Sequence, residues 1–262
     1  MLKIAWLTLK GSARDRIFIV IFAFCILFFF IPVFSSFSMR QIQEVSITMS
    51  LNLNSAILLF LSIFGGVSTI WRDVERKYIY NVLSHPIRRT DYILGRFLGL
   101  FALMFMVSVI NFILSVIDIN ISASMYKSQL PINYINIMVA FLFSLFKYTL
   151  LMAFAFLVDS FATSFFMPFF LTIAIFFAGN TSQGVYEYIM EGATKYSVIF
   201  KDIVTAIYYI LPNFSSFDFT PQAVYNLSIN LNSVFVTIVY FILYFVVVMT
   251  LTCWIFERRN LT

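Results

Sequence analysis

Residue types that carry enzyme or metal chemistry are scarce in this sequence. Its 262 residues include one histidine, His85, and two cysteines, Cys25 and Cys253, which are far apart in the chain. No His-x-x-x-His, Cys-x-x-Cys or Met-x-x-Met spacing occurs, so neither metal-assisted nor histidine-based catalysis is expected. We expect no catalytic residue, no metal ligand and no cofactor in this chain.

The sequence also lacks a site for nucleotide hydrolysis. A P-loop requires Gly-x-x-x-x-Gly-Lys-Ser/Thr, because backbone N–H groups and a lysine together hold the phosphates. Gly179 and Gly184 have the glycine spacing, but Val185 and Tyr186 follow them. If ATP drives this protein, the ATPase is expected to be another polypeptide.

Lys147 is the one charge inside an otherwise apolar stretch, residues 132–158. It lies eleven residues from the end of that stretch, about 16 Å along a helix, which is farther than a lysine side chain reaches to water. Depth counting places Ser108 and Thr172 level with it in neighbouring stretches. Two interpretations stay open: a structural lysine that donates to carbonyl or hydroxyl oxygens, or a pathway residue that binds an anionic or polar substrate.

Helices that cross a membrane must position these side chains. Hydrophobic residues make up 61% of the chain and charged residues 11%, whereas soluble domains have roughly 45–50% and about 25%. A water-soluble globular fold is therefore excluded, and lipid must be the solvent for most of the chain. We predict an all-α polytopic membrane fold in which residues 1–262 form one transmembrane domain.

Six apolar stretches are long enough to cross about 30 Å of hydrocarbon, which takes roughly 20 helical residues. They cover residues 17–34, 51–70, 97–117, 132–158, 161–178 and 234–256. Because the number is even, both termini are predicted to lie on one side of the membrane.

The Lys and Arg residues indicate which side that is. Of the 17, Lys147 lies inside a span, and Arg40, Lys127, Lys195 and Lys201 fall on the side opposite the termini. The others fall on the side of the termini, and positive charges near span ends stay in the cytoplasm. We predict that both termini are cytoplasmic. The net charge of +5 then needs no nucleic-acid partner to explain it.

Two further helices are predicted outside the spans. Near the N-terminus, Ile4 and Trp6 alternate with Lys3, which is typical of an amphipathic helix on the inner membrane surface. The outer loop 179–232 contains the apolar stretch 196–211, which is too short between its charges to span. Whether this second helix lies in the interface or re-enters the membrane is left open.

The loop 71–96 between the second and third stretches is the long cytoplasmic segment. Ile70, Val74 and Tyr78 form one stripe of a helix, and charged residues point elsewhere, which predicts an amphipathic helix along the membrane surface. Thr90 is a suitable N-cap for the helix that leads into the third span.

The run from Ile79 to Gly99 resembles the loop between spans two and three of type-2 ABC transporter permeases. In that family an acidic segment leads to a Leu-Leu-Ser-x-Pro-like turn, an Arg-Thr-Glu-like helix start and a Gly-Lys-x-x-Gly at the beginning of the third span. The matching residues here are Glu75, Leu83, Ser84, Pro86, Arg89, Thr90, Asp91, Gly95, Arg96 and Gly99. The family's Gly-Thr pair is replaced by Lys77-Tyr78. The chain is most similar to permeases of multicopper-enzyme and nitrous oxide reductase maturation.

The resemblance implies how the protein works. The amphipathic loop helix is expected to be a coupling helix that docks on a separate ATPase subunit, which binds ATP and magnesium, and two permease copies form the pathway. The residues that this implies for coupling are Arg72, Asp73, Glu75, Arg76, Tyr78, Leu83, Ser84, Pro86 and Arg89. Gly95 and Gly99 form a Gly-x-x-x-Gly pair, for which close helix packing is expected.

The same resemblance implies the partners and the location. We expect a cytoplasmic ATPase dimer, a second copy of the permease or a related permease, membrane lipid and an extracytoplasmic accessory protein. The expected location is the cytoplasmic membrane of a bacterium, and the expected direction is export.

Two other classes of protein stay open. A secondary transporter or channel needs no ATPase, but such folds often have inverted repeats and several intramembrane charges. A membrane scaffold or sensor that transports nothing would tolerate replacement of Lys147.

Overall fold

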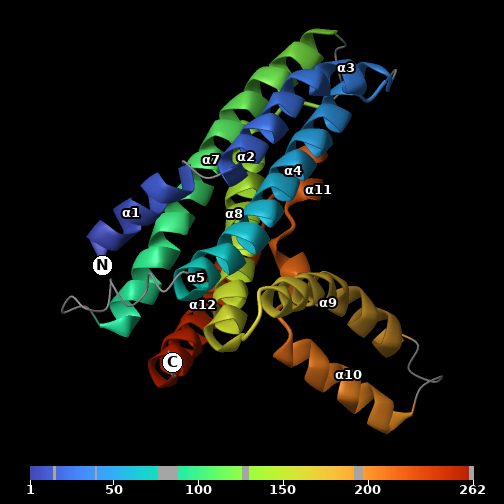
Figure 1. Cartoon of the computed structure of the whole chain (residues 1–262). Coiled ribbons are helices and arrows are strands. Elements are labelled where there is room, and N and C mark those ends of the chain that lie inside the picture. Colours follow the sequence, from blue (N-terminus) through green and yellow to red (C-terminus); the bar gives the residue numbers. More distant parts are fainter. Residues whose placement is uncertain (14–15, 39, 76–87, 126–129, 192–196, 260–262) are drawn as a thin grey trace.

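The computed structural model describes residues 1–13, 16–38, 40–75, 88–125, 130–191 and 197–259, and every regular element within these ranges is a helix (Figure 1). The α-helices are α1 (Leu2–Ala13), α2 (Arg16–Ile26), α3 (Ile31–Ser36), α4 (Ile42–Phe60), α5 (Gly66–Glu75), α7 (Arg89–Met125), α8 (Tyr134–Phe161), α9 (Phe166–Glu191), α10 (Val198–Ile210), α11 (Thr220–Val224) and α12 (Leu231–Arg258). Two 3-10 segments, η1 (Leu27–Phe30) and η3 (Phe214–Phe217), and one π segment, η2 (Leu61–Gly65), complete the set.

Five of the described helical stretches are long and apolar enough to cross a membrane. They are Ile19–Ser36, Ile42–Asp73, Arg89–Met125, Tyr134–Phe161 and Leu231–Arg258. Each contains most of one predicted span, so the chain is an all-helical, multi-pass membrane protein. The second and third are longer than predicted, because polar and charged residues at their ends pack against protein and do not end the helix.

The predicted span 161–178 differs most from the structure. Phe161 is the last residue of α8, and α9 begins at Phe166 and continues to Glu191, into the stretch predicted as outer loop. α9 is not among the five candidate spans. It leaves the bundle and forms a hairpin with α10, which occupies most of the predicted helix 196–211 (Figure 1). Six spans therefore stay a prediction.

The segment between α8 and α12 nevertheless returns the chain across the bundle. Asn136, near the start of α8, donates hydrogen bonds to the carbonyls of Gln222 and Leu227, both at 3.0 Å, just before α12 begins. At the other end, Arg259 donates to the carbonyl of Asp159 in the last turn of α8 at 2.9 Å. α8 and α12 thus run in the same direction, and the two termini lie at one end of the bundle (Figure 1).

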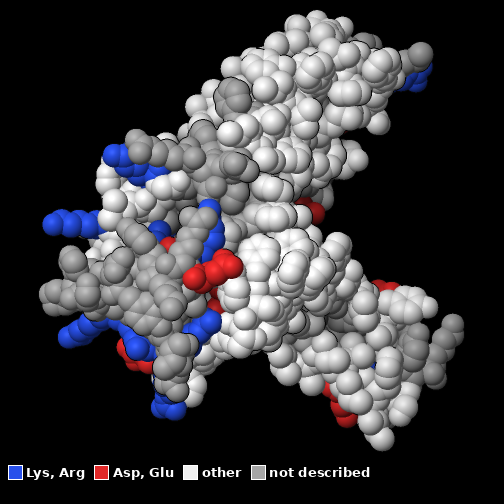
Figure 2. All heavy atoms as spheres, viewed as in Figure 1, with Lys and Arg blue, Asp and Glu red and all other residues white. Residues whose placement is uncertain are grey.

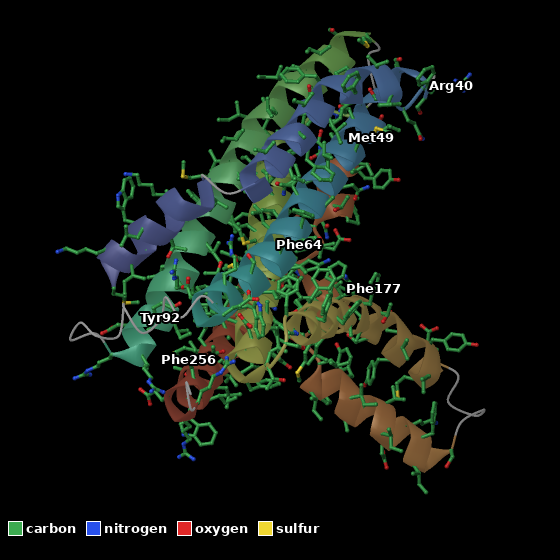
Figure 3. The ribbon with its side chains drawn as sticks, in the orientation of Figure 1. Arg40, Met49, Phe64, Tyr92, Phe177 and Phe256 are labelled. Atoms are coloured by element: carbon green, nitrogen blue, oxygen red, sulfur yellow. The ribbon has the colours of Figure 1, made fainter. Side chains whose placement is uncertain are left out.

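That end is here called the basic end, because exposed Lys3, Lys10, Arg88 and Arg258 lie there. Figure 2 shows Lys and Arg gathered at this end, while most of the visible bundle is free of charge. Arg40 lies at the opposite end (Figure 3). The charged residues are therefore concentrated at the two ends of the bundle, with an apolar middle between them, as a membrane-spanning bundle requires.

Aromatic rings fill the core near the basic end. Tyr92 and Phe256 are fully buried and lie stacked with ring centroids 6.1 Å apart (Figure 3). Phe97 meets Phe156 edge-on at 5.4 Å. These contacts join α7, α8 and α12 directly beneath the charged residues described next.

Candidate functional site

An ion pair at the basic end connects α5 to α7. Arg96 of α7 pairs with the carboxylate of Asp73, and the Tyr92 hydroxyl donates to the same carboxylate oxygen. The Arg96 and Asp73 side chains are only 16% and 14% exposed. Arg96 also donates to the hydroxyl of Thr8 in α1 at 3.2 Å. The Asp73 carboxylate therefore holds the end of α5 against α7, and Arg96 connects this ion pair to α1.

A second set of contacts joins the ends of α8 and α12. Arg259 donates to the carbonyls of Asp159 and Ala162, at 2.9 and 2.6 Å, and so binds orphan oxygens at the end of α8. The carboxylate of Asp159 accepts the backbone N–H of Trp71 at 3.1 Å. Arg89 donates to the carbonyl of Glu257 at 3.1 Å. Movement of α5 at this end must therefore disturb α7, α8 and α12.

Some of the predicted coupling residues can now be placed. Glu75 is exposed at the end of α5, and Nε of Arg72 donates to the carbonyl of Ser68 one turn earlier, at 3.0 Å. Asp73 turns inward to Arg96, and Arg89 binds the last carbonyls of α12, so both residues are used inside this chain. The remaining members, Arg76, Tyr78, Leu83, Ser84 and Pro86, lie outside the described residues.

The Gly-x-x-x-Gly pair of α7 lies under α1. A Cβ atom on Gly95 would be 2.8 Å from the Cβ of Ile4, and one on Gly99 would be 2.6 Å from the carbonyl oxygen of Ala5. Only glycine lets the backbones approach this closely. The partner of this packing face is the N-terminal helix, whose Trp6 is 65% exposed on its outer side.

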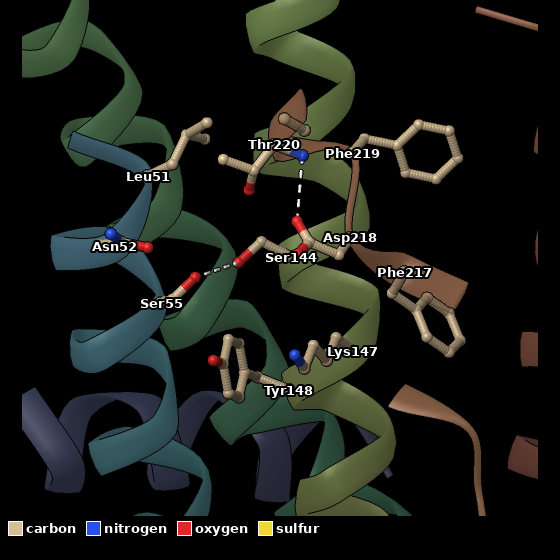
Figure 4. A pocket seen from close by; sticks show the side chains of 11 residues that line it. Leu51, Asn52, Ser55, Ser144, Lys147, Tyr148, Phe217, Asp218, Phe219 and Thr220 are labelled. Carbon is tan, nitrogen blue, oxygen red and sulfur yellow. Dashed lines mark hydrogen bonds between the residues drawn. The ribbon is translucent and has the colours of Figure 1, made fainter. Parts of the chain in front are cut away.

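Lys147 lines a polar pocket of about 160 Å³ between α4, α8 and the segment 217–220 (Figure 4). Its ammonium group is 5.7 Å from the centroid of the Tyr148 ring and 5.8 Å from that of Phe176 in α9, within cation–π range. Asp218 brings a carboxylate to the same pocket and accepts the backbone N–H of Thr220 at 3.0 Å. The pocket can therefore offer a cation and an anion to a polar ligand.

Ser108 and Thr172 do not join this pocket. Ser108 lines a separate apolar groove with Phe105 and Met138. Thr172 is fully buried and donates to the carbonyl of Pro168 at 2.7 Å, within its own helix. Depth along a span did not predict neighbours, because it does not specify which face of each helix a residue occupies.

The comparison with protein families decides the class of this chain. A model described as ABC-2 family transporter protein matches residues 2–261. The chain belongs to the ABC-2 transporter family. No curated protein matches it significantly. Membership means that this is a membrane transport subunit and not itself an enzyme, and it implies in general a partnership with an ABC ATPase subunit.

Sequence reasoning missed the residue of this ABC-2 protein that faces Lys147. Asp218 falls in the predicted outer loop 179–232, and no charge or polar motif beside it indicates a contact with Lys147. The chain reversal after α10 brings η3 and α11 back against α8, where Phe217 and Phe219 are 1% and 5% exposed. Those buried phenylalanines on either side of the aspartate are the one sequence signal that the segment packs inside the bundle.

Proposed function

We propose that this chain is the permease subunit of an ABC exporter, and that two copies form the substrate pathway. A separate cytoplasmic ATPase dimer drives it and docks at the basic end, on the coupling segment that follows α5. The carrying observation is the Asp73 carboxylate, which Arg96 and Tyr92 hold against α7. Because of this contact, a partner protein that pulls on the coupling segment also pulls directly on α7 of the bundle.

The proposed cycle uses that connection. ATP binding closes the ATPase dimer and displaces α5, and the ion pair passes the displacement to α7 and α1. Because Arg259 and Arg89 join the ends of α8 and α12 to the same region, the whole basic end moves together. Access to the pathway then alternates between the two sides of the membrane.

The pocket of Lys147 and Asp218 is the proposed substrate contact. A lysine far from either membrane surface is costly unless it faces protein or a hydrated path, and this one lines a polar pocket to which Asp218 also brings a carboxylate. A small anionic or zwitterionic polar group has the matching charges. The narrower role in copper-enzyme maturation stays a prediction from sequence resemblance.

The decisive experiment is purification of the tagged chain in mild detergent from its native host, with identification of what co-purifies. We expect a stoichiometric P-loop ATPase with measurable ATP hydrolysis. Simultaneous charge reversal, Glu75→Arg with Arg76→Glu, is expected to dissociate or uncouple that ATPase. Asp202→Lys, a charge reversal on the exposed face of α10, is the matched control and should keep the complex.

Two results would contradict the proposal. A stable, pure chain with no ATPase would favour a secondary transporter or a scaffold. A complex that stays intact and fully coupled after the charge reversal would show that the ATPase docks elsewhere.

A further inference from the structure

A continuous row of buried polar side chains lies between α4 and α7. On α7 it contains Asn111, Ser115, Asp118 and Ser122, which recur at intervals of three and four residues and so share one helix face. On α4 it contains Ser46, Ser50 and Asn54. Asp118 is 3% exposed and the others are 0% exposed. These seven residues are called the polar seam below.

One hydrogen bond sets the register of the two helices. Asn111 donates from its amide nitrogen to the amide oxygen of Asn54 at 3.0 Å. The two helices run antiparallel (Figure 1). Moving one turn toward the C-terminus of α7 from this bond therefore corresponds to moving one turn toward the N-terminus of α4. Ser115 then lies opposite Ser50, and Asp118 lies opposite Ser46.

Both ends of the polar seam have further polar contacts. Beyond Asp118, the Ser122 hydroxyl is 3.3 Å from that of Ser35 in α3. At the other end, Asn54 is followed by Ser55, which turns to α8, lies 3.3 Å from Ser144 and lines the Lys147 pocket. The polar seam therefore extends from the half of the bundle that lies away from the basic end to the depth of the pocket.

Four side-chain oxygens of the polar seam are buried without a hydrogen-bond partner among the described residues. They belong to Ser46, Ser50, Ser115 and Asp118. Buried polar atoms are nearly always paired, since an unpaired one costs free energy. Four such atoms along one helix interface, one of them from a carboxyl group, need partners that the described residues do not supply, and buried water is the usual partner of such groups.

No described basic side chain contacts Asp118. The helices packed against this part of α7 contribute few titratable groups. They are Glu44 of α4, Cys25 of α2, whose thiol donates to the Asn111 amide oxygen at 3.4 Å, and Tyr134, Lys147 and Tyr148 of α8; η1 and α3 contribute none. The charged residues of α1, α5 and α12 lie at the basic end, and Lys147 lines its own pocket. A buried carboxylate without a cation is neutralised by binding a proton.

We propose that Asp118 is a proton-binding site inside the membrane-spanning bundle, and that water molecules bound by the hydroxyls of Ser115, Ser50 and Ser46 pass protons to and from it. In the release step the O–H bond of the carboxyl group breaks, and its electron pair stays on Asp118. The proton binds a lone pair of a water molecule held by the seam hydroxyls, and that water gives up one of its own protons to the next water and so to bulk water at the end of the bundle away from the basic end. This proposal does not depend on the identity of the transported substrate.

Infrared spectroscopy of the full chain in lipid nanodiscs, with its ATPase where the two co-purify, tests the site. At neutral pH we expect a carbonyl band of a protonated carboxyl group that disappears in Asp118→Asn, which keeps the size and hydrogen bonding of the side chain. Asp202→Asn removes an exposed carboxyl group and should leave the band unchanged. A band that is equally strong in Asp118→Asn would overturn the proposal.

Transfer to D2O tests the path. In a proton path the carboxyl band shifts as deuterium reaches Asp118. Ser115→Ala is expected to slow the shift roughly tenfold, because the water that transfers the deuteron loses about one hydrogen bond. Ser124→Ala is the control, because this exposed hydroxyl donates only within its own helix, to Ile121 at 2.6 Å. A band that never shifts, or equal rates in the two serine variants, would reduce Asp118 to a structural acid and refute the path. Because Ser115→Ala retains Asp118, the test remains usable if Asp118→Asn does not fold.

Discussion

The Asp73 side chain contributes both to the stability of the fold and to the proposed coupling between the ATPase and the bundle. Its position in the loop suggested a surface residue that meets a partner, yet its carboxylate is bound by Arg96 and Tyr92 inside the chain. Removing one member of a largely buried ion pair leaves the other charge uncompensated, which costs more than the pair contributes.

Arg96→Gln is therefore expected to lower the free energy of unfolding by about 3 kcal/mol. Thermal unfolding of the detergent-solubilised protein measures this loss, with the exposed Arg88→Gln as the control. The double variant Arg96→Gln with Asp73→Asn should lose less than the sum of the two single variants, because both remove the same interaction. Additive losses would show that the two residues are not coupled in solution.

Lys147→Met tests the substrate role of the pocket. It keeps the length of the side chain and removes the charge, so the protein and its complex should assemble as before while transport fails. Complementation of a strain that lacks the gene measures transport without knowledge of the substrate. Lys10→Met, on the exposed face of α1, is the control. Full complementation by Lys147→Met would favour the structural interpretation of this lysine.

At the scale of elements, the docking of α1 depends on two glycines of another helix. The alternation of apolar residues with lysines predicted a helix on the membrane surface, and the structure adds that it lies across Gly95 and Gly99 with Thr8 only 2% exposed. A side chain on Gly99 would meet the α1 backbone, which cannot yield as a flexible side chain does.

Gly99→Leu is expected to displace α1 from α7. A cysteine introduced as Thr8→Cys, in a chain whose Cys25 and Cys253 are replaced by serine, should then react with a thiol reagent several times faster. Gly184→Leu is the matched control, because a Cβ atom there has nothing within 4 Å. Equal labelling rates in the two glycine variants would mean that α1 is not held by this face.

At the scale of the whole molecule, the return of the chain between α8 and α12 brings the two termini together. α9 diverges from the bundle, and the segment with η3 and α11 then runs back to the start of α8. The termini therefore lie at one end although only five described helices meet the length and hydropathy of a span.

Labelling from outside the cell tests the orientation. In a chain without its native cysteines, Arg40→Cys is expected to react with a membrane-impermeant thiol reagent in intact cells, and Arg258→Cys only after the membrane is opened. The reason is that Arg40 and the basic end lie at opposite ends of the bundle (Figure 3). Labelling of both positions in intact cells would contradict the predicted topology.

The sequence by itself determined the membrane class, the all-helical fold, most span positions and the family resemblance, because hydropathy and local motifs are properties of single segments. It also contained the polar spacing of α4 and α7, which marks a buried face. Only the tertiary structure decided that Asp218 faces the Lys147 pocket, that Ser108 and Thr172 do not, and that Asp73 turns inward to Arg96. Such contacts depend on helix rotation and on which helices are neighbours, and these follow from packing over the whole chain and not from any one segment.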